Sequence, residues 1–390
     1  MPEYVWLLLA LLPLAAWSGW RAAAHYYQRG EKRQQDSISS NYFRGLNYLL
    51  NEQPDKAIEV FLELAEINQE TVETHLALGN LFRRRGEVDK AIGFHRHIMT
   101  RSNLGEQHRT QALLELGEDY MRAGLLDRAE KLFSDLAESD PRCEAAIRSL
   151  LSIYQQEKDW QRAIAQARTL GDIADTDCSA LIAQFYCELA ARAQSKADLV
   201  TCRENLAHAR SYQAECVRVL LIESELLISE RNWAEAAKAC QDACEIDPDI
   251  AVLVVDTLKR CFEESGTREA LLQWLKELAG RASTTAPVRT FATLRARTDP
   301  GQAIGYLLNQ LQQRPSVRDL HHLLELMHDH GHGLDKIDPR VLRQLMSRLL
   351  HDQARFRCQH CGFSGQTWHW QCPSCREWES TRPIQGVLGE

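Results

Sequence analysis

The chain has 390 residues, of which 44% are hydrophobic and 26% charged, and its formal net charge is −8 at pH 7. This composition is typical of a folded protein and argues against extended disorder. The negative net charge argues against generic nucleic-acid binding, which requires concentrated Lys and Arg. Of the twelve cysteines, four cluster near residue 365 and the others are scattered through predicted helices, which indicates reduced, buried thiols rather than a secreted disulfide framework.

Residues 1–20 are predicted to form a transmembrane anchor. The stretch from Tyr4 to Trp20 contains no charged side chain, and it extends to Ala24 if Arg21 snorkels, which gives a helix of about 31 Å. The alternative is a cleaved signal peptide, but no basic side chain precedes the apolar run. The sequence therefore favours an anchor that remains in the membrane.

Residues 21–36 form a predicted basic juxtamembrane linker. The positive residues follow the apolar span, and they are Arg21, Arg29, Lys32 and Arg33. Because positive flanks stay on the cytoplasmic side, we expect a single span with most of the chain in the cytoplasm.

A period of about 34 residues covers residues 37–350. Gly79 and Ala91 have the same spacing as Gly117 and Ala129. One small residue per period can be followed at Ala57, Ala91, Ala129, Ala163, Cys202, Ala236, Ala270 and Ala303, at intervals of 33 to 39 residues. The pattern resembles the tetratricopeptide repeat, so the fold class is predicted to be all-α, an α-solenoid. A generic helical bundle would not keep this period.

The repeat pattern weakens after Ala270, where Thr284, Thr285 and Pro287 interrupt it. Such solenoids commonly bind protein segments, and the fold by itself predicts binding rather than catalysis. No nucleotide-binding, metalloprotease or hydrolase motif accompanies it, so we do not expect an enzyme and assign no catalytic residue.

Residues 355–390 are predicted to form a small metal-binding module. Two C-x-x-C pairs, separated by ten residues, can direct four thiolates to one tetrahedral Fe or Zn ion. The four predicted ligands are Cys358, Cys361, Cys372 and Cys375. Two disulfides are the alternative, which a reducing compartment disfavours. Aromatic side chains that could shield the ion are Phe363, Trp368, Trp370 and Trp378.

The two pairs resemble the knuckles of rubredoxins or a short zinc ribbon. Gly362 follows the first pair, where a permissive backbone is useful. Arg376 follows the second pair, where rubredoxins have glycine, and the spacer is shorter than in rubredoxins. Both departures disfavour an electron-transfer role.

Two other clusters have structural interpretations. A histidine-rich run is predicted to be an exposed helix end and loop rather than a second metal site, and it contains His321, His322, His328, His330 and His332. Cys240 and Cys244 lie one helical turn apart and are predicted to pack in the core.

The whole chain resembles the lipopolysaccharide assembly protein B family of Gram-negative bacteria. The likeness includes the segment Gly-Asn-Leu-Phe-Arg-Arg-Arg-Gly-Glu-Val-Asp at 79–89, the first knuckle at 356–363 and Cys-Pro-Ser-Cys-Arg at 372–376. The arginine at 376 is therefore interpreted as a feature of this family. Only the four knuckle cysteines carry over as functional residues.

This resemblance implies a non-enzymatic inner-membrane adaptor that regulates lipopolysaccharide synthesis. The implied partners are an FtsH-type membrane protease, the UDP-3-O-acyl-N-acetylglucosamine deacetylase that the protease destroys, and an inner-membrane regulatory protein. The sequence leaves the oligomeric state open, including a homo-oligomer. One alternative is a rubredoxin-like redox protein.

The other alternative is a nucleic-acid-binding ribbon. Its basic residues would be Arg355, Arg357, Arg376 and Arg382. They are offset by Glu377, Glu379 and Glu390, so no nucleic-acid partner is predicted.

Overall fold

The computed structural model describes residues 72–100, 104–330 and 353–387, together with a few positions between 21 and 60 and between 346 and 351. The predicted anchor and nearly all of the predicted linker at 21–36 lie outside the described residues. In the described part of the chain, no helix has both the length and the apolar character that a membrane crossing requires. The chain divides into two compact units, Met1–Asp159 and Trp160–Glu390.

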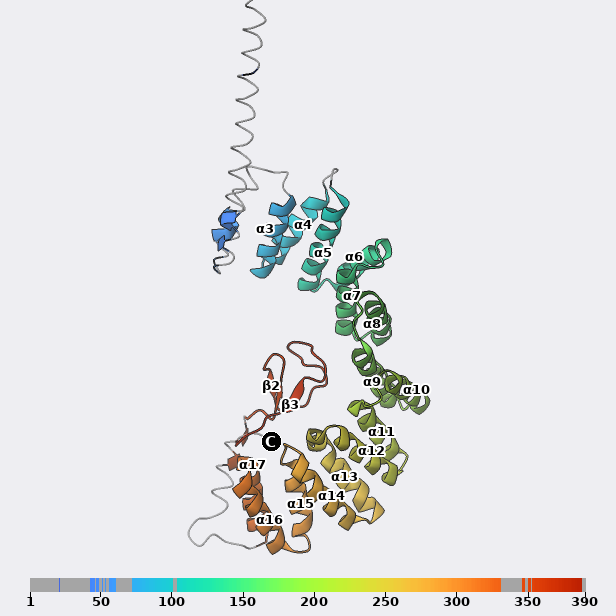
Figure 1. Ribbon diagram of the computed structural model, residues 1–390, viewed down its shortest axis with the longest axis vertical. Helices are drawn as coiled ribbons and strands as arrows, with labels where there is room; N and C mark the ends of the chain where they lie inside the picture. Colours follow the sequence, from blue (N-terminus) through green and yellow to red (C-terminus); the bar gives the residue numbers. More distant parts are fainter. Residues whose placement is uncertain are drawn as a thin grey trace, which may run out of the picture. The chain divides into compact units, whose positions relative to one another are not determined.

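Helices that pack against their neighbours in the sequence build the described part of the first unit (Figure 1). They are α3 (Val72–Arg84), α4 (Val88–Met99), α5 (Glu106–Arg122), α6 (Leu126–Ser139) and α7 (Glu144–Glu157).

The second unit contains ten α-helices among its described residues, followed by a small sheet. The helices are α8 (Trp160–Ala174), α9 (Ser179–Ser195), α10 (Leu199–Tyr212), α11 (Val217–Ser229), α12 (Trp233–Ile246), α13 (Ala251–Ser265), α14 (Arg268–Arg281), α15 (Ala286–Ala296), α16 (Pro300–Gln313) and α17 (Val317–Asp329), with a short 3-10 turn at Pro248–Ile250. The strands are β1 (Phe356–Cys358), β2 (Ser364–Gly365) and β3 (Thr381–Pro383). The predicted repeat solenoid with a small terminal module is confirmed.

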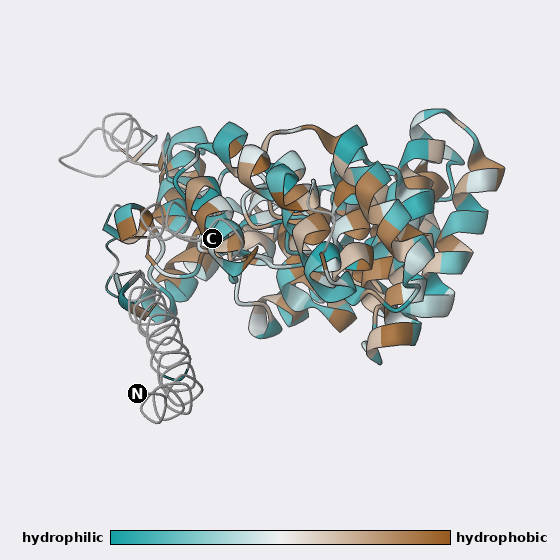
Figure 2. Cartoon of the chain, turned by 90° about the horizontal axis from the view of Figure 1, so that it is seen from above, coloured by the Kyte–Doolittle hydropathy of each residue, from teal (hydrophilic) through white to brown (hydrophobic). Residues whose placement is uncertain are grey.

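The helices form because apolar and polar residues alternate with helical periodicity, so that single helices carry both kinds of residue along their length (Figure 2). Several helices also begin at a capping side chain. Asp198 accepts a hydrogen bond from the backbone N–H of Thr201, and Asp299 accepts one from that of Gln302.

Glycine and alanine keep their period because paired helices cross closely at those positions. A Cβ atom on Gly117 would lie 2.3 Å from Cζ of Phe133, a fully buried ring. The same atom on Gly79 would lie 2.2 Å from Nε2 of His95. The small residue of the predicted period is buried in every repeat except one. Ala270 is exposed and the adjacent Leu271 is buried, so the period slips by one residue there.

The repeat also continues through the predicted interruption. Thr285 directly precedes α15, and Pro287 lies in the first turn of this helix, where its missing N–H and fixed φ are tolerated. Helix pairing therefore extends to α17, beyond the point at which the sequence pattern weakens.

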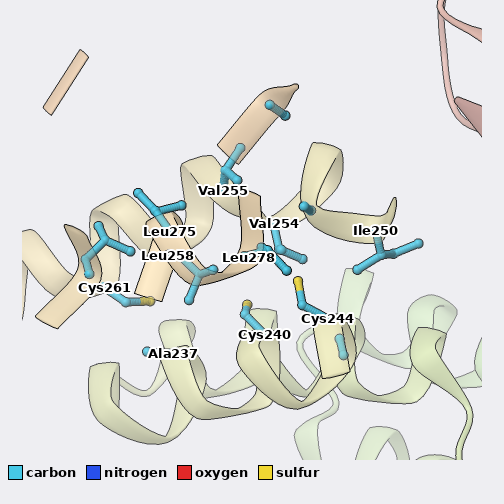
Figure 3. Close-up of a cluster of buried hydrophobic side chains, with 14 of the residues drawn as sticks. Ala237, Cys240, Cys244, Ile250, Val254, Val255, Leu258, Cys261, Leu275 and Leu278 are labelled. Atoms are coloured by element: carbon cyan, nitrogen blue, oxygen red, sulfur yellow. The ribbon is translucent and has the colours of Figure 1, made fainter. Parts of the chain in front are cut away.

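The largest apolar cluster of the second unit contains three cysteines (Figure 3). Cys240 and Cys244 of α12 direct their sulfurs toward side chains of α13 and α14, and Cys261 of α13 lies in the same cluster. Burial raises the pKa of Cys240 to about 11 and that of Cys244 to about 12, so both stay protonated at neutral pH. Their predicted packing role is confirmed.

One buried polar cluster joins α3, α4 and α5 in the first unit. Nδ1 of His95 lies 2.6 Å from Oδ2 of Asp119, and Nε2 lies 3.4 Å from the carbonyl oxygen of Leu76. Arg83 donates to Oδ1 of Asp119 at 2.9 Å. Because His95 and Asp119 are fully buried, their hydrogen bonds determine how these helices pack rather than forming a site open to solvent.

Candidate metal centre

The candidate centre is built on a three-stranded antiparallel sheet with the strand order β2-β1-β3. Arg357 in the middle strand is opposite Ser364 of β2 and Arg382 of β3. Each C-x-x-C segment forms a tight turn beside this sheet. We call residues 353–387 the ribbon.

The two knuckle turns have equivalent backbone geometry. The backbone N–H of Gly362 donates to the carbonyl oxygen of Cys358 at 3.0 Å, and that of Arg376 donates to the carbonyl oxygen of Cys372 at 2.8 Å. Gly362 has a φ of 78° and Arg376 a φ of 62°, both left-handed. Arg376 therefore keeps the conformation that glycine would favour, and the departure from rubredoxins changes the residue but not the turn.

The four sulfurs form a tetrahedral site. Sγ of Cys358 lies 3.7 Å from Sγ of Cys375, Sγ of Cys361 lies 3.7 Å from Sγ of Cys372, and all four lie within 4.8 Å of one another. A tetrahedral ion with metal–sulfur bonds of about 2.3 Å requires sulfur separations of about 3.8 Å. A disulfide would require about 2.05 Å. The distances match metal coordination, which suits zinc and iron equally.

Hydrogen bonds prepare two of the sulfurs for the thiolate form. The Ser380 hydroxyl lies 3.2 Å from Sγ of Cys358, and its hydrogen bond, together with backbone N–H groups of Cys361 and His360, lowers the pKa of Cys358 to about 6. The backbone N–H of Phe363 lowers the pKa of Cys361.

The pKa of Cys375 shifts in the opposite direction. The backbone N–H of Glu377 lowers its pKa, but burial and the three neighbouring sulfurs outweigh this effect and raise it to about 12. Four thiolates this close repel one another, so their joint ionisation requires a cation among them.

The ribbon's aromatic side chains contact the helices of the second unit as well as each other. Trp378 makes edge-to-face contacts with Trp160 of α8 at 6.1 Å and with Phe185 of α9 at 5.9 Å between ring centroids. Trp368 and Trp370 pack against the cluster that α12 to α14 form. The sequence predicts that aromatic rings shield the metal, and the structure shows that three of these rings, Trp368, Trp370 and Trp378, also contact the helices.

Polar contacts surround this aromatic junction. Arg218 of α11, only 7% exposed, lies over the rings of Trp370 and Trp378 at 5.5 and 5.7 Å. Nε2 of Gln184 donates to Oε1 of Glu379 at 2.8 Å. Arg218 and Gln184 were not predicted as functional residues, because each occupies an ordinary helical position and its partner lies far away in the sequence.

The segment after β3 returns to the helices. Gln385 donates to Oγ of Ser283 at 2.8 Å, and the backbone N–H of Val317, at the start of α17, donates to the carbonyl oxygen of Val387 at 2.8 Å. Arg382 lies 3.6 Å from the carboxylate of Asp247. The ribbon therefore contacts the helices of the second unit through both its sheet and the segment that follows β3.

The histidine-rich run does not join the cysteine site. His321 and His322 are half-buried in α17 near the carboxylate of Glu325, so the predicted exposed helix end applies only further along, at His330. His332 lies outside the described residues. Among the residues that the structure describes, the four cysteines are the one group of His, Cys, Asp or Glu with metal-binding geometry.

Fold and site together define a tetratricopeptide-repeat protein with a rubredoxin-type metal ribbon. The rubredoxin metal-binding domain model matches residues 356–383, and tetratricopeptide-repeat models match residues 74–110 and 114–176.

Over its whole length the chain is similar to proteins named lipopolysaccharide assembly protein B. It is 33% identical to that of Escherichia coli (strain K12) over 385 residues, 98% of this chain and 99% of the relative. It is 32% identical to that of Haemophilus influenzae over 393 residues, 97% of this chain and 98% of the relative. The chain belongs to the lipopolysaccharide assembly protein B family.

Solved structures give only a loose likeness. The C-terminal part of a repeat-containing protein from Cytophaga hutchinsonii has a TM-score of 0.40 at 12% identity, covering 68% of this chain and 98% of that one. MamA from Desulfovibrio magneticus has a TM-score of 0.35 at 15% identity, covering 46% and 96%. Neither bears on function.

Proposed function

We propose that this protein is a non-enzymatic adaptor of lipopolysaccharide assembly at the inner membrane. Similarity along almost the whole chain to proteins named lipopolysaccharide assembly protein B carries this proposal. In the proposed role, the protein promotes destruction of the UDP-3-O-acyl-N-acetylglucosamine deacetylase by an FtsH-type membrane protease, and a second inner-membrane protein relieves this action.

The architecture supports an adaptor because tetratricopeptide helices offer binding surface. An adaptor raises the effective concentration of a substrate beside its protease, and a membrane anchor at residues 1–20 would place both on the same surface. A form lacking residues 1–20 should therefore fold and bind its partners but regulate weakly.

We propose that Cys358, Cys361, Cys372 and Cys375 bind one Fe or Zn ion. The sulfur separations of 3.7 Å support this assignment. Metal bound there would hold together a module too small to build its own core, and the same module carries the Trp378 and Glu379 contacts to the helices. The proposed role of the ion is structural: it fixes the surface that the ribbon and the helices form together.

The test of the adaptor function is the half-life of the deacetylase in cells. With the protease present, depletion of this protein should lengthen that half-life and raise lipopolysaccharide levels, and restoring the intact chain should reverse both effects. The purified protein alone should degrade nothing. An unchanged half-life on depletion contradicts the adaptor function.

Topology is tested separately. A reporter fused after the ribbon should behave as cytoplasmic, and the mature protein should retain residues 1–20. Periplasmic alkaline phosphatase activity from the fusion would contradict the proposed orientation.

A redox function is the alternative, and one observation favours it. Cys361 is exposed, so one ligand of an iron centre would be accessible to an electron-transfer partner. Iron in the purified protein with a reversible visible absorption change on reduction would support this alternative. Zinc at one equivalent would exclude it.

A further inference from the structure

A pocket of about 410 Å³ opens on the ribbon beside Cys358. Two arginines, Arg357 and Arg382, and two glutamines, Gln359 and Gln385, supply its polar side chains, and no acidic residue lines it. The pocket therefore offers hydrogen-bond donors and positive charge without a carboxylate to neutralise them.

The two arginines are held close together by the sheet. Arg357 of β1 and Arg382 of β3 are directly opposite each other in the antiparallel register, so their side chains project from the same face. Like charges in this arrangement repel, with Cβ atoms only about 5 Å apart. A bound anion between the guanidinium groups would turn this repulsion into attraction.

Of the two arginines, only Arg382 lies near a carboxylate among the described residues. Arg382 lies 3.6 Å from the carboxylate of Asp247. Arg357 is exposed, and its Nε donates to the hydroxyl of Ser364 at 3.4 Å. Within the described residues, no carboxylate forms an ion pair with Arg357. The N–H donors of its two terminal nitrogens are therefore available to a ligand.

We propose that this pocket binds a phosphate monoester. A phosphate monoester presents several anionic oxygens, which match two guanidinium forks, and the amides of Gln359 and Gln385 can donate to the oxygens that remain. The volume admits the phosphate and a small group attached to it. The phosphate can belong to a soluble metabolite or to a lipid headgroup, and the chemistry at the pocket is the same.

A different role for the same arginines is charge compensation at the metal centre. Four thiolates and one divalent ion carry a net charge of −2, and the pocket adjoins Cys358. Arg357 would then affect metal retention but bind no ligand. The two roles are separated by measuring metal content and anion binding on the same samples.

The probe is glycerol 3-phosphate, titrated calorimetrically into the metal-loaded full chain in detergent. We expect saturable binding that Arg357→Gln weakens about tenfold or more, since charged hydrogen bonds are lost. The control is Arg203→Gln, which removes an exposed arginine of α10 that does not line the pocket. It should bind like the unaltered chain. Metal content should be one equivalent in all three proteins.

The lipid source is tested with the full chain in phosphatidylcholine nanodiscs, with or without phosphatidic acid, which carries the same headgroup phosphate. Slower hydrogen exchange of residues 356–385 only with phosphatidic acid, absent in Arg357→Gln, assigns the lipid source. Protection by glycerol 3-phosphate alone assigns the soluble source.

Three results would overturn the proposal. They are no binding of either probe, equal binding by Arg357→Gln, or loss of metal from Arg357→Gln without anion binding by the unaltered chain. Binding of a tetraglutamate peptide in place of both phosphate probes would also overturn it and assign the pocket to an acidic protein segment.

Discussion

Replacing Trp378 by alanine should release the ribbon from α8 and α9 without removing its metal. The substitution removes two edge-to-face contacts, with Trp160 at 6.1 Å and Phe185 at 5.9 Å. It also removes the cation–π contact with the Arg218 guanidinium, which lies 5.7 Å from the ring. Each aromatic pair contributes about 0.5–1.5 kcal/mol and the cation–π contact about 0.5–2 kcal/mol, together about 1.5–5 kcal/mol. The undocked fraction should therefore rise by a factor between about ten and a few thousand.

Alkylation of Cys216 measures this fraction. Cys216 is 2% exposed, and Nε2 of Gln184 lies 3.7 Å from its Sγ and 2.8 Å from Oε1 of Glu379 in the ribbon. The alkylation rate, followed by mass spectrometry of the Cys216 peptide, should rise about tenfold or more in Trp378→Ala. Phe363→Ala is the matched control, because Phe363 is 38% exposed and its ring contacts His369 inside the ribbon. If Trp378→Ala retains its metal and its Cys216 is alkylated at a rate within about twofold of that in the unaltered chain, the calculated contribution of Trp378 to docking is wrong.

Three further predictions concern the repeats, the metal and the buried carboxylate. Gly117→Ala should lower the free energy of unfolding of the first unit by about 1–3 kcal/mol, because its Cβ would lie 2.3 Å from Phe133; an unchanged denaturation midpoint would contradict the close crossing. Cys358→Ser should reduce bound metal from one equivalent to near zero while circular dichroism still reports the helices, and retained metal would show that the ligand is misassigned. Burial raises the pKa of Glu379, so docking should strengthen as the pH falls from about 7 toward 4.5 and weaken as the pH rises through the raised pKa. Glu379→Gln keeps an acceptor for Gln184 and should lose this dependence, measured as the difference in melting temperature between the two proteins across that range.

The helical array and the metal ligands could be predicted because their signals are local. Gly117 and Ala129 recur with the repeat since each crossing imposes the same steric limit, and the cysteine spacing directly encodes two turns. The sequence does not reveal that Leu271, rather than Ala270, takes the buried position in its repeat. A shift of one residue leaves the residue types within the repeat unchanged.

The contact surface between the ribbon and the helices could not be predicted from the sequence, for a different reason. Arg218 and Trp378 are 160 positions apart, and nothing in the neighbourhood of either residue indicates the other. Arginine in a repeat helix ordinarily indicates solvent, whereas here the ribbon covers it. The pocket between Arg357 and Arg382 was hidden in the same way, since only the strand register brings the two guanidinium groups together.

The hydrogen bond from the backbone N–H of Val317 to the carbonyl oxygen of Val387 joins the end of the ribbon to the first residue of α17. This bond satisfies one of the backbone N–H groups that the first turn of a helix leaves without an intrahelical partner. The last residues of the ribbon therefore also cap α17, and loss of these residues should weaken the first turn of this helix.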